Sequence, residues 1–208
     1  AAADLSEVLG KKEHVARYQS AAQEIQTGIM THLWDEVSGT FIKQIDNSSG
    51  SVVRDTTLDV SSVYGVFSFG VLPVLDLRLT RAWEATTRRL SQGIAIGGIA
   101  RYEGDNYFRV DPNAAGNPWV ITTLWYAEYL IARARVEADF DRVREIFNWV
   151  ARYAPRSGVL PEQFNSQTGE ALSAMPLAWS HAAYVSAVIA YLDRREKLGL
   201  CIDCNPVP

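Results

Sequence analysis

Residues 117–136, NPWVITTLWYAEYLIARARV, and residues 140–153, FDRVREIFNWVARY, decide the fold of this chain. The first stretch has few polar positions, which predicts a helix buried on most sides, with Asn117 as its cap and Pro118 in its first turn. The second stretch carries an apolar stripe opposite charged side chains, the pattern of an amphipathic helix with one exposed face. An inner ring of helices enclosed by an outer ring would produce this pairing.

The same alternation extends to both sides of these two helices. Apolar residues three and four positions apart predict an amphipathic helix over residues 12–33. Residues 58–69 read as a nearly all-apolar helix, and residues 80–90 as a charged, solvent-facing one. A last helix is expected over residues 179–197. The chain is therefore expected to be all-α, with helices arranged in concentric pairs.

The number of helices limits how much of a ring this chain can form. About seven helices fit, whereas a closed toroid of six pairs needs roughly twice that number at ~30–35 residues per pair. A solenoid would alternate in the same way, but we find no repeat of fixed period. One β-hairpin is expected, because apolar residues at 41–45 and 52–53 flank the turn sequence Asn-Ser-Ser-Gly at 47–50.

Composition points to one soluble globular domain spanning residues 1–208. The 20 basic and 24 acidic side chains are dispersed and give a net charge of -4, so nucleic acid is not expected as a partner. The longest apolar run, residues 63–75, is too short to cross a bilayer and contains Gly and Pro. No charged n-region followed by an apolar h-region opens the chain, so we expect neither a membrane span nor a signal peptide.

Cys201 and Cys204 are the two cysteines of the chain, and they form a C-x-x-C motif near its end. Two cysteines exclude a disulfide framework, and a zinc site would need two more ligands. Two thiols or one local disulfide are therefore favoured over a redox or metal role. No cofactor is expected.

Two loops carry the side chains suited to catalysis. Their sequences are GGIARYEGDNY at residues 97–107 and GVLPEQF at residues 158–164. Together they place carboxylates, an arginine and aromatic rings in the neighbourhood of buried helices. Cleavage of a glycosidic bond uses two carboxyl groups across the bond, donors for sugar hydroxyls and rings for the sugar face.

The residues by themselves leave structural interpretations of these loops open. Glu162 follows Pro161 and would suit the first turn of a helix, where the helix dipole favours a carboxylate. Arg101 with Glu103 or Asp105 would form a local ion pair that holds its loop together. Each of these interpretations competes with a direct role in binding or catalysis.

The aromatic residues and one histidine have similar alternatives. Trp119, Trp125 and Trp179 suit a hydrophobic core as well as a sugar platform. His181 lies in an apolar helix, where a hydrogen-bonded core histidine is the more common occurrence. Its neighbour Ser180 does not make a catalytic triad, because adjacent residues on a helix point in different directions.

Several ordered blocks of the sequence resemble glycoside hydrolase family 15, the glucoamylases, glucodextranases and related bacterial α-glucosidases. The blocks lie at 98–107, 116–125, 160–163, 168–170 and 176–182, with further similarity at 33–41 and 58–61. The resemblance covers almost the whole chain in the order of the family. It implies an (α/α)6 barrel, of which this chain would be the C-terminal half, with one short hairpin. It also implies hydrolysis of α-glucans or α-glucosides from the non-reducing end, with inversion.

The resemblance implies roles for individual residues. Glu162 is similar to the general base that activates the attacking water, and Arg101 to an arginine that hydrogen-bonds substrate hydroxyls, with Tyr102 beside it. Trp179 is similar to a tryptophan that closes around the sugar. The weaker candidates in the first loop are Glu103, Asp105 and Tyr107. Inversion requires an ionised base and a protonated acid roughly 6.5–9.5 Å apart.

The general acid of the family belongs to a Trp-Glu motif that precedes all of these blocks. The one Trp-Glu pair here, Trp83-Glu84, comes too late in the order and lies in the polar helix, so we interpret it as a surface coincidence. We therefore expect the chain to be a fragment that is inactive alone. Exposed flanks of inner helices would make it self-associate or pair with a missing N-terminal half.

Two further interpretations remain open. The chain could be a catalytically inactive helical module that binds carbohydrate or a protein partner. It could also be another α/α toroid such as a polysaccharide lyase, but lyases favour Tyr, His or Lys bases. The Leu-Pro-Glu-Gln block at residues 160–163 argues against a lyase.

Overall fold

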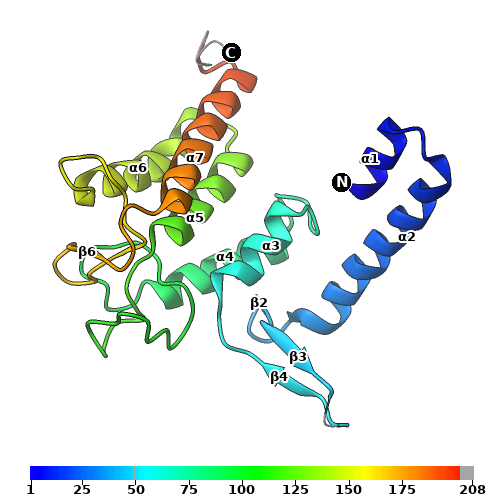
Figure 1. Ribbon diagram of the computed structural model, residues 1–208, viewed down its shortest axis with the longest axis horizontal. Coiled ribbons are helices and arrows are strands. Elements are labelled where there is room, and N and C mark those ends of the chain that lie inside the picture. The colour runs from blue at the N-terminus through cyan, green and yellow to red at the C-terminus, as the bar shows by residue number, and fades with distance from the viewer. Residues whose placement is uncertain (49, 202–208) are drawn as a thin grey trace.

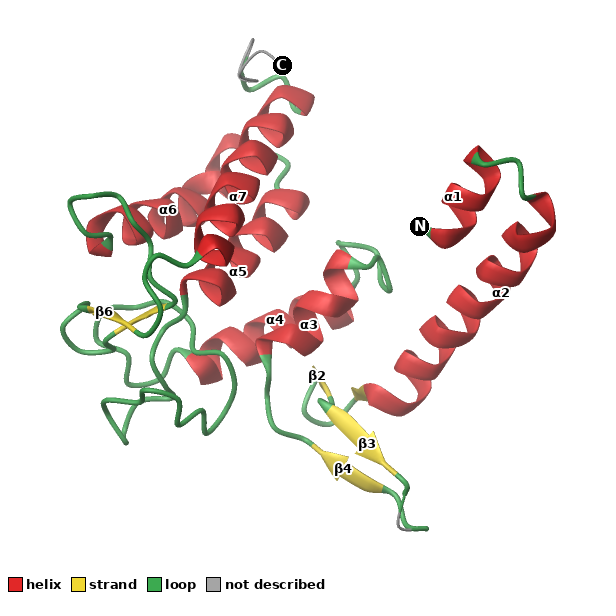
Figure 2. Cartoon of the chain, viewed as in Figure 1, coloured by secondary structure: helices red, strands yellow, loops and turns green. Residues whose placement is uncertain are grey.

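The computed structural model describes residues 1–48 and 50–201 (Figure 1). In chain order the elements are α1 (Ala2–Val8), α2 (Lys12–Gly28), a π-helical turn (Ile29–Leu33), β1 (Trp34–Asp35), β2 (Thr40–Phe41), β3 (Gln44–Asp46), β4 (Val53–Asp55), α3 (Val60–Ser68), α4 (Leu77–Leu90), α5 (Val120–Arg133), a 3-10 turn (Glu137–Phe140), α6 (Asp141–Tyr153), β5 (Gln163–Phe164), β6 (Ala171–Leu172) and α7 (Ala178–Lys197). Helices predominate, and the described strands form short antiparallel pairs (Figure 2). The all-α prediction is confirmed.

Helix α5 lies at the centre of the helical body, in contact with α3, α6 and α7. It buries residues on most of its circumference: Val120, Ile121, Thr122, Thr123, Leu124, Ala127, Tyr129 and Ile131. Helix α6 instead buries one stripe, Val143, Ile146 and Val150, and leaves its charged side chains exposed. The predicted succession of a buried helix and an amphipathic helix is therefore confirmed, and it follows from the number of neighbours that each helix has.

Helix α4 is less exposed than its charges suggested. It buries a stripe of residues spaced three or four apart: Leu79, Ala82, Trp83, Thr86 and Leu90. Trp83 is only 1% exposed, and its ring stacks on Tyr129 of α5 at 5.3 Å. The prediction of Trp83 as a surface residue is therefore wrong. Its neighbour Glu84 is exposed, because it lies on the opposite side of the same helix.

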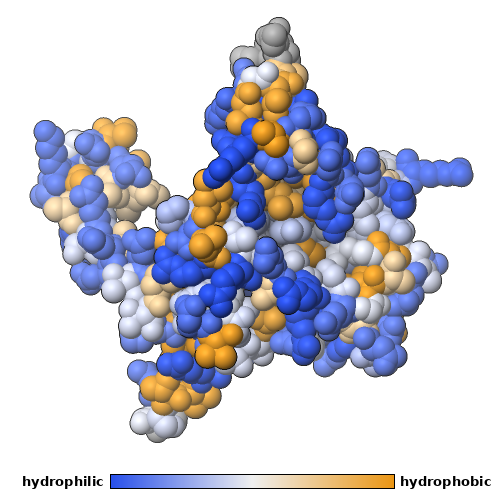
Figure 3. Space-filling model, turned by 180° about the vertical axis from the view of Figure 1, so that it is seen from behind, coloured by the Kyte–Doolittle hydropathy of each residue, from blue (hydrophilic) through white to orange (hydrophobic). Residues whose placement is uncertain are grey.

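Helices α1 and α2 form an arm that stands apart from the body (Figure 1). The helix predicted over residues 12–33 is confirmed as α2 continued by the π-helical turn, but none of the 17 residues of α2 is buried. Ile25, in the predicted apolar stripe, is 63% exposed. One bond to the body is a hydrogen bond of 2.6 Å from Gln26 Nε2 to the Val71 carbonyl. Apolar side chains are visible on the arm from behind (Figure 3).

The segments before α3, α5 and α7 are joined at one end of the body. Isolated antiparallel bridges connect Asp59 with Tyr102, Ala100 with Pro118, and Trp119 with Gln163. The amide of Val60, the first residue of α3, donates to the Arg101 carbonyl at 3.1 Å. The amide of Val120, the first residue of α5, donates to the Glu162 carbonyl at 3.1 Å. The starts of two buried helices therefore hold the two loops that the sequence selected.

Helix α5 begins later than predicted. Asn117 does not cap it, because the helix starts at Val120 with Trp119 in the capping position. The Pro118 carbonyl accepts a hydrogen bond of 3.0 Å from the Phe164 amide, which keeps residues 117–119 extended. The buried Asn117 amide instead donates to Gln163 Oε1 at 2.7 Å. Asn117, the predicted cap, therefore connects the two loops by hydrogen bonds.

The remaining predictions concern the hairpin, membrane spans and cysteines. The hairpin is confirmed as β3 and β4, with Ile45 paired to Arg54. Across residues 1–48 and 50–201, no helix has the length and apolarity that a bilayer crossing requires. Within the same residues, no group of three or more His, Cys, Asp or Glu side chains converges. Cys201 is disulfide-bonded, and Cys204 lies outside the described residues.

Candidate active site

Glu162 lies at a bend of the loop immediately before β5, not in the first turn of a helix. The helix-dipole interpretation of this residue is therefore wrong. Its amide donates to the Ala174 carbonyl at 3.0 Å, and its carbonyl accepts the amide of Val120. Both backbone groups are thus fixed, one by the loop before α7 and the other by the start of α5.

The carboxylate of Glu162 has one anchored oxygen and one open oxygen. Ser173 Oγ donates to Glu162 Oε2 at 2.5 Å and also lies 3.1 Å from the hydroxyl of Tyr107. Glu162 Oε1 has no hydrogen-bond partner among the described residues, and the side chain is half-buried. A carboxylate held in this way can accept a proton from a water molecule at its open oxygen.

Backbone strain is concentrated in the loops around Glu162. Ser173 has φ +66° and Phe108 has φ +55°, and they are the non-glycine residues with positive φ in the described chain. Such a conformation costs about 1–3 kcal/mol and persists only where the surroundings enforce it. The Phe108 carbonyl accepts from the Asn117 amide at 2.7 Å, and Ser173 is held by Glu162. Strain of this kind is common at functional sites.

Arg101 is held by Asp105 through two parallel hydrogen bonds. Nε donates to Oδ2 and Nη2 donates to Oδ1, each at 3.0 Å, and Asp105 is 3% exposed. The guanidinium lies over the ring of Trp119 at 4.2 Å. Burial is the largest single influence and opposes its charge, but the hydrogen bonds and the charge of Asp105, with a smaller contribution from Tyr102, together raise the pKa of Arg101 above its ordinary value. Nη1 makes no hydrogen bond to a described residue and stays available to a ligand.

Tyr102 lies between two cations. The Arg101 guanidinium is 4.8 Å from the centre of its ring, and Lys43 Nζ is 4.3 Å from it. Lys43 also lies 3.3 Å from Asp59, the residue that caps α3. Lys43 belongs to the segment between β2 and β3 and was not predicted as part of the site. The structure adds it to the surroundings of the first loop.

Glu103 belongs to the same loop but points elsewhere. Its Oε1 accepts from Arg89 Nε at 2.5 Å, and its Oε2 accepts from the Leu58 amide at 3.4 Å. The carboxylate therefore joins α4 to the segment before α3. The structure does not bring it together with Arg101 and Asp105.

The tryptophans divide between the core and the surface. Trp119 is 3% exposed, and Trp125 stacks on Tyr64 at 4.3 Å with nearly parallel rings. Trp179 is 54% exposed at the start of α7, with its ring edge-on to Trp125 at 5.8 Å. The ring of Trp179 is therefore accessible to a ligand, whereas the buried ring of Trp119 packs against the Arg101 guanidinium.

His181 and Ser180 fasten the segment that leads to Glu162. The Leu160 amide donates to His181 Nε2 at 2.9 Å, and Ser180 Oγ donates to the Pro161 carbonyl at 2.7 Å. Both contacts are structural, as expected for His181. They fix the two residues before Glu162 to the first turn of α7.

Sequence reasoning missed Ser173, which contacts Glu162 and also lies beside the hydroxyl of Tyr107. The hairpin β5–β6 pairs Gln163 with Leu172, and this register sets Glu162 beside Ser173. A hairpin prediction over residues 163–172 would have found the contact. The strands are two residues long, too short for a period-2 pattern to be recognised.

A family model identifies the relatives of this chain. The model described as glycosyl hydrolases family 15 matches residues 1–148 and 138–189. The chain belongs to this family. The resemblance that the ordered blocks indicated is confirmed.

Two curated relatives resemble this chain over different lengths. An uncharacterised glycosyl hydrolase of Methanocaldococcus jannaschii is 29% identical over 190 residues, which cover 87% of this chain and 28% of the relative. Glucoamylase P of Amorphotheca resinae is 29% identical over 137 residues, which cover 46% of this chain and 21% of that protein. The chain thus spans less than a third of either relative.

Solved structures of family-15 enzymes share the fold. A bacterial glucoamylase complexed with acarbose has a TM-score of 0.74 and 21% identity over 92% of this chain and 31% of that one. The family-15 glucoamylase of Hypocrea jecorina has a TM-score of 0.67 and 21% identity over 92% of this chain and 40% of that one. The fold is accordingly of the (α/α)6-barrel type, as predicted.

Proposed function

We propose that this chain forms part of the active site of an inverting, exo-acting glycosidase that releases glucose from α-glucans or α-glucosides. The observation that carries the proposal is the carboxylate of Glu162, with one oxygen anchored by Ser173 and the other open. Membership of family 15 supports glycoside hydrolysis as the reaction class.

Glu162 acts as the general base in this proposal. Its open oxygen takes a proton from a water molecule while the water oxygen bonds to the anomeric carbon. A carboxylic acid on the opposite side of the sugar protonates the departing glycosidic oxygen, so the bond breaks with inversion. Ser173 fixes the carboxylate so that its free lone pairs face the water.

Arg101 binds the sugar through the free Nη1 donors, and Asp105 is its positioning residue because both carboxylate oxygens hold the guanidinium. Tyr102 belongs to the same loop, and its ring packs beside the Arg101 guanidinium. The exposed ring of Trp179 supplies an apolar face against the sugar ring. Glu103 remains the weakest candidate, because its carboxylate is committed to Arg89 and the Leu58 amide.

We further propose that the general acid comes from a part of the protein outside this chain. Glu84, in the one Trp-Glu pair of the sequence, lies on the exposed side of α4, whereas Glu162 lies where the starts of the buried helices meet. The isolated chain is then inactive and acts as a helical module that pairs through its uncovered apolar faces. Those faces include Leu5, Val8 and Ile25 on the arm and Val185 and Ile189 on α7.

The test is Glu162→Gln in the protein with a complete family-15 catalytic domain. The amide keeps the shape of the side chain but cannot take the proton, so kcat for glucose release from maltose should fall by ~10²–10⁴-fold. Glu170→Gln, on the same hairpin and exposed, is the matched control and should keep full activity. NMR of the first product formed should detect β-glucose. An unchanged kcat in Glu162→Gln would exclude Glu162 as the general base. Initial release of α-glucose would exclude an inverting mechanism.

A further inference from the structure

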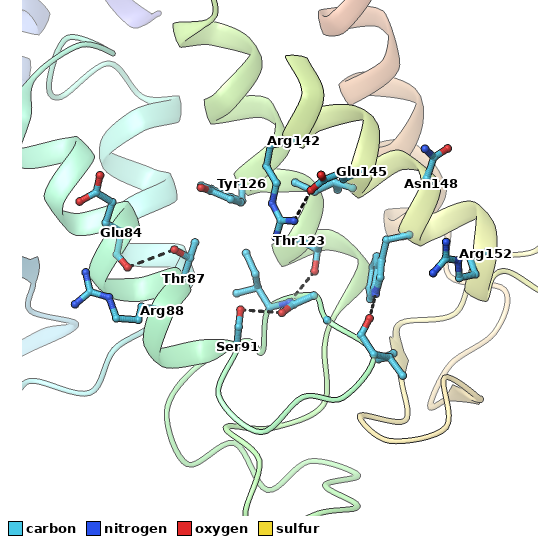
Figure 4. A pocket seen from close by; sticks show the side chains of 16 residues that line it. Glu84, Thr87, Arg88, Ser91, Thr123, Tyr126, Arg142, Glu145, Asn148 and Arg152 are labelled. Atoms are coloured by element: carbon cyan, nitrogen blue, oxygen red, sulfur yellow. Dashed lines mark hydrogen bonds and ion pairs between the residues drawn. The ribbon is translucent and has the colours of Figure 1, made fainter. Parts of the chain in front are cut away.

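A cavity of about 640 Å³ lies between the outer helices α4 and α6, with α5 beneath it (Figure 4). The loop residues Gly97, Gly98 and Ile99 close one end. None of the residues proposed for catalysis or sugar binding at Glu162 lines this cavity. We call it the α4–α6 cleft.

Polar side chains line both walls of the α4–α6 cleft at helical spacing. The α4 wall presents Glu84, Thr87, Arg88 and Ser91, and the α6 wall presents Arg142, Glu145, Asn148, Trp149 and Arg152. In Figure 4 the labelled side chains of the two walls stand on either side of Tyr126 and Thr123 of α5. The lining residues of α6 extend over ~15 Å of helix axis. The cleft therefore fits an elongated ligand better than a single small ion.

Several of these polar groups have no partner among the residues that the structure describes. The side chains of Glu84, Arg88, Asn148 and Arg152 make no hydrogen bond or ion pair with any described residue, and neither does the hydroxyl of Tyr126. Most of Tyr126 is buried, and burial raises its pKa, so the hydroxyl stays a neutral donor. Its oxygen is not among the fully buried polar atoms that lack a partner, so it is accessible from the cleft. Ligand groups can satisfy these donors and acceptors.

The charges on the walls select the kind of ligand. Each wall carries both signs of charge: Glu84 and Arg88 lie on α4, and Arg142, Glu145 and Arg152 lie on α6, where Arg142 donates a hydrogen bond to Glu145 at 2.6 Å. A polyanion such as nucleic acid requires a concentrated positive face, which the two carboxylates prevent. An apolar ligand would displace water from Arg88, Arg152 and Glu84 without replacing its hydrogen bonds. A chain of hydroxyl groups both donates and accepts, so it matches guanidinium, amide and carboxylate neighbours together.

The cleft also offers rings. Trp149 forms part of the α6 wall, and its indole N–H donates to the Ile96 carbonyl at 2.9 Å, which fixes its orientation. Tyr126 lies on the floor. Aromatic rings beside polar groups suit the two kinds of surface of a sugar, its apolar C–H face and its hydroxyl rim.

We propose that the α4–α6 cleft is a second carbohydrate-binding site, which holds a segment of a glucan chain away from Glu162. That the ligand is an α-glucan rests on the proposed function. That the ligand is a carbohydrate rests on the residues of the cleft itself. Binding at two places on one chain raises the effective concentration of a long substrate at the catalytic site. Short substrates cannot reach both sites and gain nothing.

The direct test is titration of the 208-residue chain with maltoheptaose by isothermal calorimetry and NMR. The double variant Asn148→Ala/Arg152→Ala changes two exposed side chains and should weaken binding at the cleft by about 10-fold or more. Tyr126→Phe removes one hydroxyl and should weaken it by roughly 2–10-fold. Arg17→Ala, an exposed arginine on α2, is the matched control and should bind as the unaltered chain does. Arg101→Ala should leave the cleft binding intact.

The outcomes separate the cleft from the proposed function. Unchanged binding in both cleft variants, or loss of all binding in Arg101→Ala, overturns the second site. If cellohexaose binds with the same sensitivity to the cleft variants and maltoheptaose does not, the cleft is a carbohydrate site and the α-glucan assignment fails. In the complete enzyme, the cleft variants should raise KM for soluble starch while kcat and the KM for maltose stay constant. A constant KM for starch contradicts the proposal.

Discussion

Helices α2 and α6 both carry an apolar stripe, yet α6 buries its stripe and α2 does not. Val143, Ile146 and Val150 of α6 lie against the body, whereas no residue of α2 is buried. Hydrophobic periodicity therefore predicted both helices correctly but said nothing about the surface that covers each one. The difference lies in the neighbours: α6 packs on α5, and α2 touches the body near Val71.

The difference has an energetic meaning. Full burial of a large apolar side chain stabilises a fold by about 1.5–3 kcal/mol. The body gains this contribution from each stripe residue of α6, and the arm gains almost none from α2. Segments with few buried apolar contacts open with the least free energy. The arm is therefore expected to open before the body.

The largest expected effect compares two phenylalanines. Phe140 is fully buried with its ring edge-on to Tyr191 at 5.2 Å, and Phe69, beside the arm, is 86% exposed. Phe140→Ala should lower the free energy of unfolding by ~3–5 kcal/mol, and Phe69→Ala should change it by less than about 0.5 kcal/mol. Urea denaturation followed by circular dichroism measures both. Equal losses would mean that Phe69 is covered in solution and that the arm does not stand apart.

Two glycines give the next contrast. A Cβ at Gly98 would stand 2.6 Å from the Trp149 ring and 2.7 Å from Pro118, and its φ is +88°. Gly98→Ala should therefore destabilise the body by ~1–3 kcal/mol. Gly28, at the end of α2, has helical φ and nothing within 4 Å of a Cβ. Gly28→Ala should instead stabilise the arm by about 0.5–1 kcal/mol. The same denaturation experiment decides the signs, and a neutral Gly98→Ala would show that α6 moves away from this loop.

A smaller effect depends on pH. Burial raises the pKa of Glu128 on α5 above its ordinary value of 4.5, although the hydrogen bond from Tyr64 opposes the rise. Its contribution to stability is present below the ordinary value and is lost as pH rises through the folded value. Glu128→Gln should thus gain stability relative to the wild type between about pH 4 and pH 7.

Glu24→Gln on the arm is the control for this pH effect. Glu24 is exposed, so this variant makes the same chemical change without removing a partly buried carboxylate. Unfolding free energies at several pH values provide the comparison. A gain for Glu128→Gln that is constant with pH would contradict the role of burial.

The smallest effect on folding is expected at Ile25. Because its side chain is 63% exposed, Ile25→Ala should change the unfolding free energy by less than about 0.5 kcal/mol at low protein concentration. Val143→Ala on α6, which is fully buried, should lose clearly more. If the apolar stripe of the arm mediates self-association, sedimentation velocity will show a weaker concentration dependence for Ile25→Ala. An unchanged concentration dependence would show that the apolar stripe of the arm does not mediate self-association.

Sequence reasoning reached most elements of the fold because their signals are local. The stripe at residues 140–153 and the run at residues 117–136 predicted α6 and α5 with small errors at their ends. It failed at Asn117, whose cap chemistry was outweighed by hydrogen bonds to a segment 46 residues away. It also failed at Trp83, because the charges of α4 hid a stripe that needs α5 to cover it.

In the candidate site, too, local contacts were predicted from the sequence and contacts between distant segments were not. Arg101 was expected to form an ion pair with Glu103 or Asp105 of its own loop, and the structure pairs it with Asp105. Ser173 was missed because its contact with Glu162 depends on the hairpin between them, and strands of two residues leave no periodic signal. Glu103 was grouped with the loop by proximity, but the structure turns its carboxylate toward Arg89 on α4.

The sequence by itself determined the helical class, the family and the identity of Glu162 as the carboxylate to consider. These properties depend on residue types at short spacing, which the chain carries whether or not it is folded. Only the tertiary structure decided which stripes are covered, which oxygen of Glu162 is open and which polar groups line the α4–α6 cleft. Those properties depend on neighbours from distant segments, because burial and hydrogen bonding are settled by what packs beside each group.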